Sequence, residues 1–160
     1  MADEKNKTMM IREAVVADIP RLVELRMRLF ADVGMAPEPA ETERLREATR
    51  AYFSQAMPEG VMRTWVADND GELVGTGSVI EFIRPPYPAN LAGREAYVLN
   101  MYVLESHRRQ GLARRIFAAI MDDARARGYA KVCLHASPDG KALYESFDFV
   151  TNPTAMEWHV

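Results

Sequence analysis

The spacing of apolar residues changes several times along this chain, and each change predicts the boundary of a structural element. The three- and four-residue spacing of one helix face is present in the first third, at Ile19, Leu22, Val23, Leu25 and Leu29. A cluster of glycine and prolines from Gly34 to Pro39 then interrupts it. The expected elements are a strand at 9–13, a helix at 18–30, a loop at 32–40 and a helix at 41–57.

The middle of the chain has the alternating pattern of a half-buried sheet. Apolar and polar residues alternate through 61–68, and Asn69-Asp70-Gly71 is a strong signal for a tight hairpin turn. The partner strand is expected at 72–83. The segment RPPYPANLAG, 84–93, contains prolines that cannot donate to a ladder, so we expect a loop there and a third antiparallel strand at 94–103.

Helical spacing returns after this strand. A helix is expected from Gly111 to about Arg127, with Gly128 as its cap, followed by a short apolar strand at 131–135. A strand, helix and strand in succession usually make the two strands parallel. A short helix at 140–147 and a last strand at 155–159 complete the pattern. These elements predict an α/β (α+β) fold in which helices flank a mixed, mainly antiparallel sheet.

Composition narrows the class of protein. A chain of 160 residues, 48% of them hydrophobic, is expected to form a single domain over 9–160 behind a flexible tail at 1–8. The net charge of −3 argues against nucleic acid or an anionic membrane as a partner. The chain lacks an apolar run of the ~20 residues that span a bilayer, and from its charged, polar start we expect no secretory signal. The single cysteine, Cys133, is expected to be buried, and a cytoplasmic location follows.

Residues 105–115, ESHRRQGLARR, combine four arginines with a glycine at the expected start of a helix. The unpaired N–H groups of a first helical turn and the helix dipole favour a phosphate, and arginine adds charge-assisted hydrogen bonds. The stretch is neither a nucleoside-triphosphate loop nor a dinucleotide fingerprint, because GxxxxGK[ST] and GxGxxG are both absent. The competing interpretation is a solvated basic helix start.

The arrangement Arg108-x-x-Gly111-x-Ala113 resembles the Q/R-x-x-G-x-G/A signature of the GNAT N-acetyltransferase superfamily, at the same strand-to-helix position. The strand end before it and the segment HASPDGKALYESFDF, 135–149, are also similar to that family, so the resemblance covers about 9–149. It implies acetyl-CoA as the donor and no metal. The implied coenzyme-binding residues are Met101, Tyr102, Val103, Arg108, Arg109, Gln110, Gly111, Leu112, Ala113, Arg114 and Ser137.

The resemblance also implies catalytic roles. Tyr144 stands where many relatives keep a tyrosine that protonates the coenzyme A sulfur, although a tyrosine on a short amphipathic helix can also simply pack. Backbone N–H groups near Met101 would polarise the thioester carbonyl. Glu95 is the candidate general base, the alternative being an exposed glutamate at a strand start. Regular alternation would place Glu95 on the same face as Tyr97, Leu99 and Met101.

Other residues carry secondary hypotheses. Glu81 is an alternative base, Asn100 could position the acceptor or a water, and His135 could touch the pantetheine arm or simply pack. Two positions depart from the family pattern. Ser137 replaces an asparagine that contacts the coenzyme, and Asp148 replaces a glycine, so Asp148 is expected to adopt a left-handed conformation at some cost.

The acceptor is the least determined part of the prediction. Its determinants are expected in the variable segments 32–40 and 84–93, and we favour a small-molecule or amino-acid-like amine. A protein or peptide N-acetyltransferase and a non-catalytic acyl-CoA-binding module are the alternatives. Exposed sheet edges and the apolar C-terminal strand also suggest a homodimer.

Overall fold

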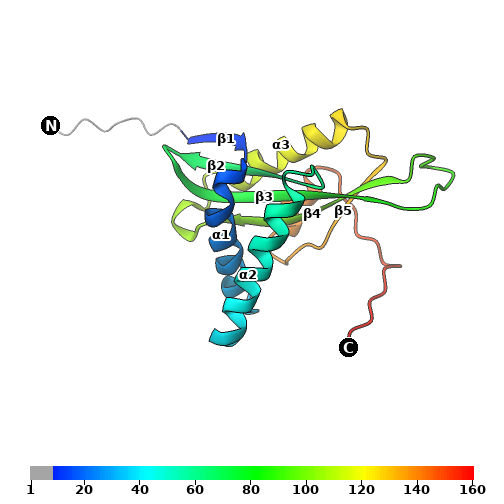
Figure 1. Cartoon of the computed structure of the whole chain (residues 1–160). Helices are drawn as coiled ribbons and strands as arrows, with labels where there is room; N and C mark the ends of the chain where they lie inside the picture. Colours follow the sequence, from blue (N-terminus) through cyan, green and yellow to red (C-terminus); the bar gives the residue numbers. More distant parts are fainter. Residues whose placement is uncertain (1–8) are drawn as a thin grey trace.

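A five-stranded sheet lies between two layers of helix in the computed structural model, which describes residues 9–160 (Figure 1). The expected tail at 1–8 lies outside the described residues. The strands are β1 (Met9–Glu13), β2 (Met62–Asn69), β3 (Glu72–Ile83), β4 (Arg94–Val103) and β5 (Lys131–Leu134). The helices are α1 (Ile19–Asp32), α2 (Pro39–Ala56), α3 (Leu112–Ala126) and α4 (Lys141–Glu145), with 3₁₀ turns η1 (Val16–Asp18) and η2 (Glu105–His107).

The strands follow one another across the sheet in chain order, β1-β2-β3-β4-β5. The first four pair antiparallel, whereas β5 pairs parallel to β4 after the α3 crossover. The predicted mixed, mainly antiparallel sheet is therefore confirmed. The predicted hairpin turn is confirmed as well, because Asp70 and Gly71 connect β2 to β3 with positive φ angles of 52° and 91°, the geometry of the turns that match strand twist.

Helix α3 covers one face of the sheet with the stripe that its sequence predicts. Its buried side chains are Leu112, Ile116, Phe117, Ile120 and Ala124. The helix approaches β3 closely because Gly77 has no side chain. A Cβ atom there would lie 2.4 Å from the sulfur of Met101 and 2.8 Å from Cγ2 of Ile116, distances that close packing cannot absorb without a shift.

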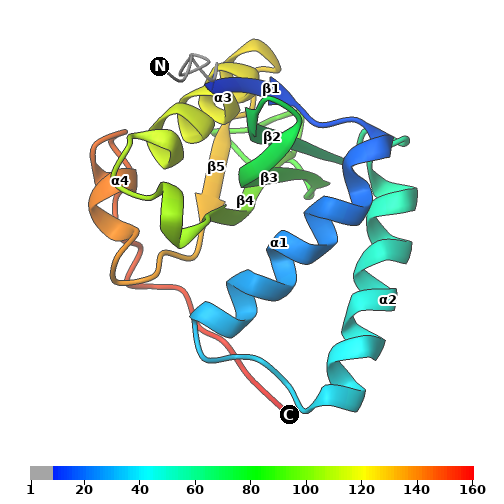
Figure 2. The same ribbon diagram turned by 90° about the vertical axis from the view of Figure 1, so that its left-hand side faces the viewer.

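Helices α1 and α2 lie on the opposite side of the sheet from α3 (Figure 2). Helix α1 packs on β3 and β4, and α2 packs along α1. The buried face of α1 consists of Ile19, Leu22, Val23 and Leu25. None of the helices in residues 9–160 has the length and apolar character that a membrane span needs.

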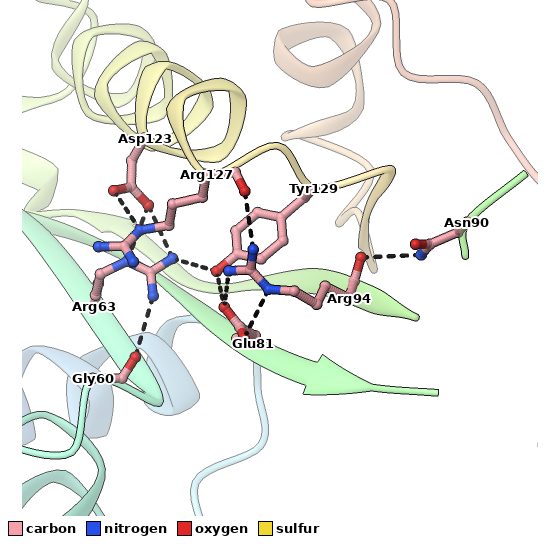
Figure 3. A network of polar contacts seen from close by, with 8 residues as sticks. All are labelled: Gly60, Arg63, Glu81, Asn90, Arg94, Asp123, Arg127 and Tyr129. Carbon is pink, nitrogen blue, oxygen red and sulfur yellow. Dashed lines mark hydrogen bonds and ion pairs between the residues drawn. The ribbon is translucent and has the colours of Figure 1, made fainter. Parts of the chain in front are cut away.

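A polar network connects the C-terminal end of α3 with strands β2, β3 and β4 (Figure 3). Arg63 of β2 binds the Asp123 carboxylate at 2.9 Å and the Tyr129 hydroxyl at 2.9 Å. Tyr129 in turn donates to Glu81 of β3, which also forms an ion pair with Arg94 of β4 at 3.0 Å. Glu81 thus has two partners. Hydrogen bonds from Arg94, which has the larger effect, and from Tyr129 lower its pKa. This geometry favours a structural role for Glu81 over the role of an alternative base.

A bulge interrupts β4 at Asn100, whose φ is 57°. Leu99 pairs with Ser78 and Tyr102 with Thr76, so Asn100 and Met101 together oppose the single residue Gly77. The bulge shifts the alternation of side chains. Asn100 bonds Ser78 and so stays on the α1 face with Leu99, while Met101 lies against Gly77 on the α3 face. The expectation that Glu95 and Met101 share a face was therefore wrong.

The last predicted strand, 155–159, was also wrong. The C-terminal segment, residues 150–160, contains no strand, and Met156 and Trp158 are 96% and 85% exposed. The alternation of apolar and polar residues is real, but a strand also needs a ladder partner, and no strand of residues 9–160 pairs with this segment.

Asp148, after α4, adopts the expected left-handed conformation, with a φ of 66°. Because left-handed φ costs a non-glycine residue about 1–2 kcal/mol and glycine adds back about 0.5–1 kcal/mol of unfolded-state entropy, Asp148→Gly should raise the free energy of unfolding by about 0.5–1 kcal/mol. Chemical denaturation measures this difference. Asp139→Gly, at a turn position without positive φ, is the control and should give no gain. An equal gain at both positions would contradict the strain.

Candidate functional site

Strand β5 is much shorter than β4 and pairs with it in parallel along its whole length, so their ladder ends before β4 does. Their ladder joins residues 95–98 to 131–134, whereas β4 continues to Val103. On the side of β5, residues 99–103 therefore have no strand partner in the described part of the chain. A strand edge left this way presents a row of backbone donors and acceptors. The opening between β4 and β5 is thus a surface on which an extended polar chain can form hydrogen bonds.

The N-terminus of α3 follows directly on this edge. Gly111 is its N-cap, with a φ of 73°, and no side chain caps the helix. The first helical acceptor, the Gly111 carbonyl, takes the Arg115 N–H at 3.0 Å, so the amides of Leu112, Ala113 and Arg114 have no acceptor within the helix. Three unpaired N–H groups at the positive end of a helix dipole favour a phosphate anion.

The Arg108 side chain points back to the fold. Its Nε donates to the Val103 carbonyl at 2.9 Å, and its guanidinium binds the Asp32 carboxylate at 2.6 Å while lying 5.6 Å from the Tyr102 ring centroid. Hydrogen bonds from Arg108, and then from Tyr102, hold the pKa of Asp32 below its usual value. Arg108 therefore fixes the loop between β4 and α3 to the end of α1.

The remaining polar side chains of the motif differ in their freedom. Arg114 donates to Ser146 at 2.8 Å and lies 4.9 Å from the Phe147 ring centroid, which links α3 to α4. Arg115 reaches the Met9 carbonyl at 3.1 Å. Arg109 and Gln110 are exposed and available to a ligand. The structure thus brings the predicted residues 101–103 and 108–114 together, with backbone amides at the centre.

Tyr144 is held in place by aromatic packing. Its side chain is 8% exposed, and its ring lies 5.0 Å from Phe117 and 6.3 Å from Phe149, centroid to centroid. Every fully buried side-chain nitrogen and oxygen within residues 9–160 has a hydrogen-bond partner. The Tyr144 hydroxyl has none among those residues, so it reaches solvent. Burial, and next Tyr97, raises the Tyr144 pKa, which keeps the phenol protonated at neutral pH as a proton donor.

Ser137 shapes the turn that precedes this tyrosine. Its Oγ accepts the Gly140 N–H at 3.1 Å. A Cβ atom at Gly140 would lie 3.2 Å from both Ser137 Oγ and the Tyr144 ring, so the three residues are in close contact. Ser137 itself is exposed, and its hydroxyl proton remains available to a ligand.

Glu95 is completely buried rather than exposed at the strand start. Its carboxylate accepts from the Tyr87 hydroxyl at 2.7 Å and from Arg84 at 3.3 Å. Burial acts to raise the pKa of Glu95, but the hydrogen bonds from Tyr87 and Arg84 outweigh it, and the net pKa lies below the ordinary value. The geometry favours a role in fastening the loop 84–93 to β4.

A second hydrogen-bonded chain begins two residues further along β4. The Tyr97 hydroxyl contacts Nδ1 of His135, which follows β5, and Nε2 of His135 lies 2.8 Å from Glu157 in the C-terminal segment. Burial is the main cause that raises the Tyr97 pKa. Sequence reasoning missed this set because it assigned the C-terminal segment to a strand and treated Tyr97 only as a neighbour of Glu95.

Arg26 of α1 is the other residue that sequence reasoning missed. Its guanidinium donates to the Asn100 side chain at the bulge and lies 4.6 Å from the Phe30 ring centroid. It forms no ion pair with any carboxylate of residues 9–160, and burial is the main cause that lowers its pKa. A partly buried arginine without a counter-ion has the charge to pair with an anion. Its position inside an ordinary helical stripe concealed it.

The comparison with protein families gives one matching model. Residues 20–149 match the model described as the acetyltransferase (GNAT) family. This match spans α1 to the end of the aromatic cluster at Phe149, and so includes the β4–β5 opening, the α3 N-terminus and Tyr144.

Individual relatives agree with the family. The chain is 29% identical over 128 residues to glucosamine 6-phosphate N-acetyltransferase 1 of Oryza sativa, covering 76% of this chain and 72% of that protein. It is 25% identical over 145 residues to the uncharacterized N-acetyltransferase YjgM of Escherichia coli, covering 87% and 80%. A crystal structure of a predicted acetyltransferase from Clostridium acetobutylicum with acetyl-CoA superposes with a TM-score of 0.87 at 26% identity, covering 95% and 96%. This chain therefore belongs to the GNAT acetyltransferase family.

Proposed function

We propose that this protein transfers the acetyl group of acetyl-CoA to the amine of a small acceptor that also carries an anionic group. The observation that carries the proposal is the juxtaposition of three elements. The free edge of β4 leads to the uncapped N-terminus of α3, and the unpartnered hydroxyl of Tyr144 lies beside that helix. In an acyl-coenzyme A complex, the β4 edge suits the pantetheine arm and the α3 N-terminus suits the diphosphate. The Tyr144 hydroxyl suits the sulfur.

The coenzyme-binding residues act mainly through their backbone. The amides of Leu112, Ala113 and Arg114 would bind the diphosphate, together with the exposed side chains of Arg109 and Gln110. The edge formed by Met101, Tyr102 and Val103 would pair with the pantetheine arm, and Ser137 could donate to it from the opposite side of the opening. Arg108 would hold the loop between β4 and α3 rather than touch the phosphates.

Acetyl transfer needs an oxyanion donor and a proton for the departing sulfur. The Met101 N–H, beside the bulge, would donate to the thioester oxygen. Tyr144 would donate its hydroxyl proton as the carbon–sulfur bond breaks and the new carbon–nitrogen bond is complete, and it would recover a proton from the acetylated nitrogen. A module that only binds acyl-CoA has no use for this hydroxyl, so the position of Tyr144 favours an enzyme.

Arg26 supports the anionic acceptor. Its guanidinium lies at Asn100, next to Met101, without a carboxylate partner. An acceptor with a carboxylate or phosphate close to its amine could pair with Arg26 while the amine lies at the thioester. The rice relative is named for glucosamine 6-phosphate, an amine that also carries a phosphate on the same sugar. A peptide or protein amine has no required anion at that distance, and this favours a small molecule over a protein substrate.

Substitution of Tyr144 by Phe tests the catalytic role. Loss of the proton donor should lower kcat by about 10²–10⁴-fold, because thiolate would have to leave unprotonated. The Kd for coenzyme A should be unchanged, since the ring packing remains. Thiol release measures turnover, and calorimetry measures coenzyme A binding. Unchanged turnover would remove Tyr144 from the mechanism.

Substitution of Arg26 by Gln tests the acceptor class. We expect KM to rise by about 10- to 100-fold for amino acids or glucosamine 6-phosphate, the equivalent of a charged hydrogen bond of about 1.5–3 kcal/mol, with little change in kcat. Amino acid methyl esters and glucosamine lack the anion, so each should have a similarly high KM with the unmodified protein and with Arg26→Gln. Arg50→Gln, an exposed arginine of α2, is the matched control. Equal KM values for charged and uncharged acceptors in the unmodified protein would contradict the anion site.

A further inference from the structure

Tyr97, His135 and Glu157 come from three separate segments and form one continuous hydrogen-bonded chain. Tyr97 lies on β4, His135 directly follows β5, and Glu157 lies in the C-terminal segment. The Tyr97 and His135 rings also pack at a tilt, with centroids 5.7 Å apart. The GNAT signatures account for none of these contacts.

The chemistry of the three groups fixes the direction of the hydrogen bonds. An ionised carboxylate can only accept, so the proton on the imidazole lies at Nε2, toward Glu157. The lone pair of Nδ1 then faces the Tyr97 hydroxyl, which donates to it. A carboxylate that fixes the tautomer of a histidine, with the other nitrogen free to accept, is the arrangement of a general base.

The position of this chain suits proton removal from the acceptor. Tyr97 is four residues before Met101, and the pairing of β4 with β5 ends at the next residue, Val98, so Tyr97 borders the opening. The charge of Tyr97, after burial, is the second cause that raises the Tyr144 pKa. At the other end, the His135 side chain is 71% exposed. The hydrogen-bonded side chains of Tyr97 and His135 therefore lead from the opening to solvent.

Among the titratable groups around Tyr97, His135 is the one that can accept its proton. Cys133 of β5 pairs with Tyr97, and burial raises the pKa of Cys133 and of Tyr144, so both remain neutral at pH 7. Glu157 is the carboxylate in contact with His135 and is itself touched by His159 at 3.1 Å. Glu95, on the same strand, is buried with its oxygens engaged by Tyr87 and Arg84.

We propose that Tyr97, His135 and Glu157 form a proton relay that deprotonates the acceptor ammonium before it attacks the thioester. The inference rests on the proposed function. The ammonium gives one proton to the Tyr97 oxygen as the Tyr97 proton moves to Nδ1 of His135, and the exposed imidazolium releases it to water. The neutral amine forms the carbon–nitrogen bond, a second proton reaches the sulfur through Tyr144, and the third remains on the amide nitrogen. Glu157 acts as the positioning residue.

The test is the pH dependence of kcat/KM for His135→Ala. We expect a fall on the order of 100-fold at pH 7, which narrows steadily as the pH approaches the acceptor's own pKa, because the neutral amine then forms without the relay. Imidazole added to the buffer should restore activity to His135→Ala, since the side chain it replaces is exposed. Tyr97→Phe should show the same pH dependence without rescue, and Glu157→Gln a smaller loss.

His159→Ala is the matched control, because His159 contacts the same carboxylate but not Tyr97. It should retain the unmodified pH profile and gain nothing from imidazole. A fractional loss in His135→Ala that is equal at every pH, without rescue, would show a structural role and overturn the relay. Failure of the proposed function is distinct, since the unmodified protein would then release no thiol with any amine.

Discussion

The site depends on a ladder that stops early. The strands β4 and β5 pair only through Val98 and Leu134, and the last five residues of β4 keep one edge free. If β5 were as long as β4, the backbone groups of that edge would be hydrogen-bonded to it. Here it stays free because β5 ends at Leu134, so the role proposed for this edge depends on the shortness of β5.

The bulge at Asn100 sets which face of the sheet each side chain at the end of β4 points to. By adding a residue to β4, it turns Asn100 toward Arg26 and α1, while Met101 faces Gly77 and α3. In the proposed mechanism, the same strand thus presents one side to the acceptor and the other to the acetyl donor. Arg108 then fixes the end of the strand to Asp32 of α1, which joins the two layers at the coenzyme loop. Burial of Tyr144 against Phe117 fixes the proposed proton donor on the α3 side.

Sequence reasoning predicted the residues that we propose for the coenzyme, but not Arg26 and the other contacts that we propose for the acceptor, for a physical reason. Local patterns carry the five strands up to Leu134, the hairpin at Asp70-Gly71, the α3 stripe and the glycine at its N-cap, and all of these were confirmed. The left-handed Asp148 was also confirmed. Long-range contacts carry the rest. The partners of Glu95 and Arg26 depend on how loop 84–93 and α1 meet β4, and no periodicity encodes that.

The C-terminal segment shows the same limit. Its alternating residues have the spacing of a strand, but pairing depends on a partner elsewhere in the chain, and the segment instead brings Glu157 to His135. The bulge likewise reversed the face predicted for Met101, since one added residue changes the side of all that follow it. Errors of this kind arise at the places where the site departs from regular geometry.

The central claim is that the free edge of β4 and the first turn of α3 bind the coenzyme. Amide hydrogen exchange, with and without coenzyme A, tests it most directly. The account predicts slowed exchange at amides within residues 99–103 and at Leu112, Ala113 and Arg114, with little change in β1 and β2. Binding of coenzyme A without protection at these two segments would contradict the account.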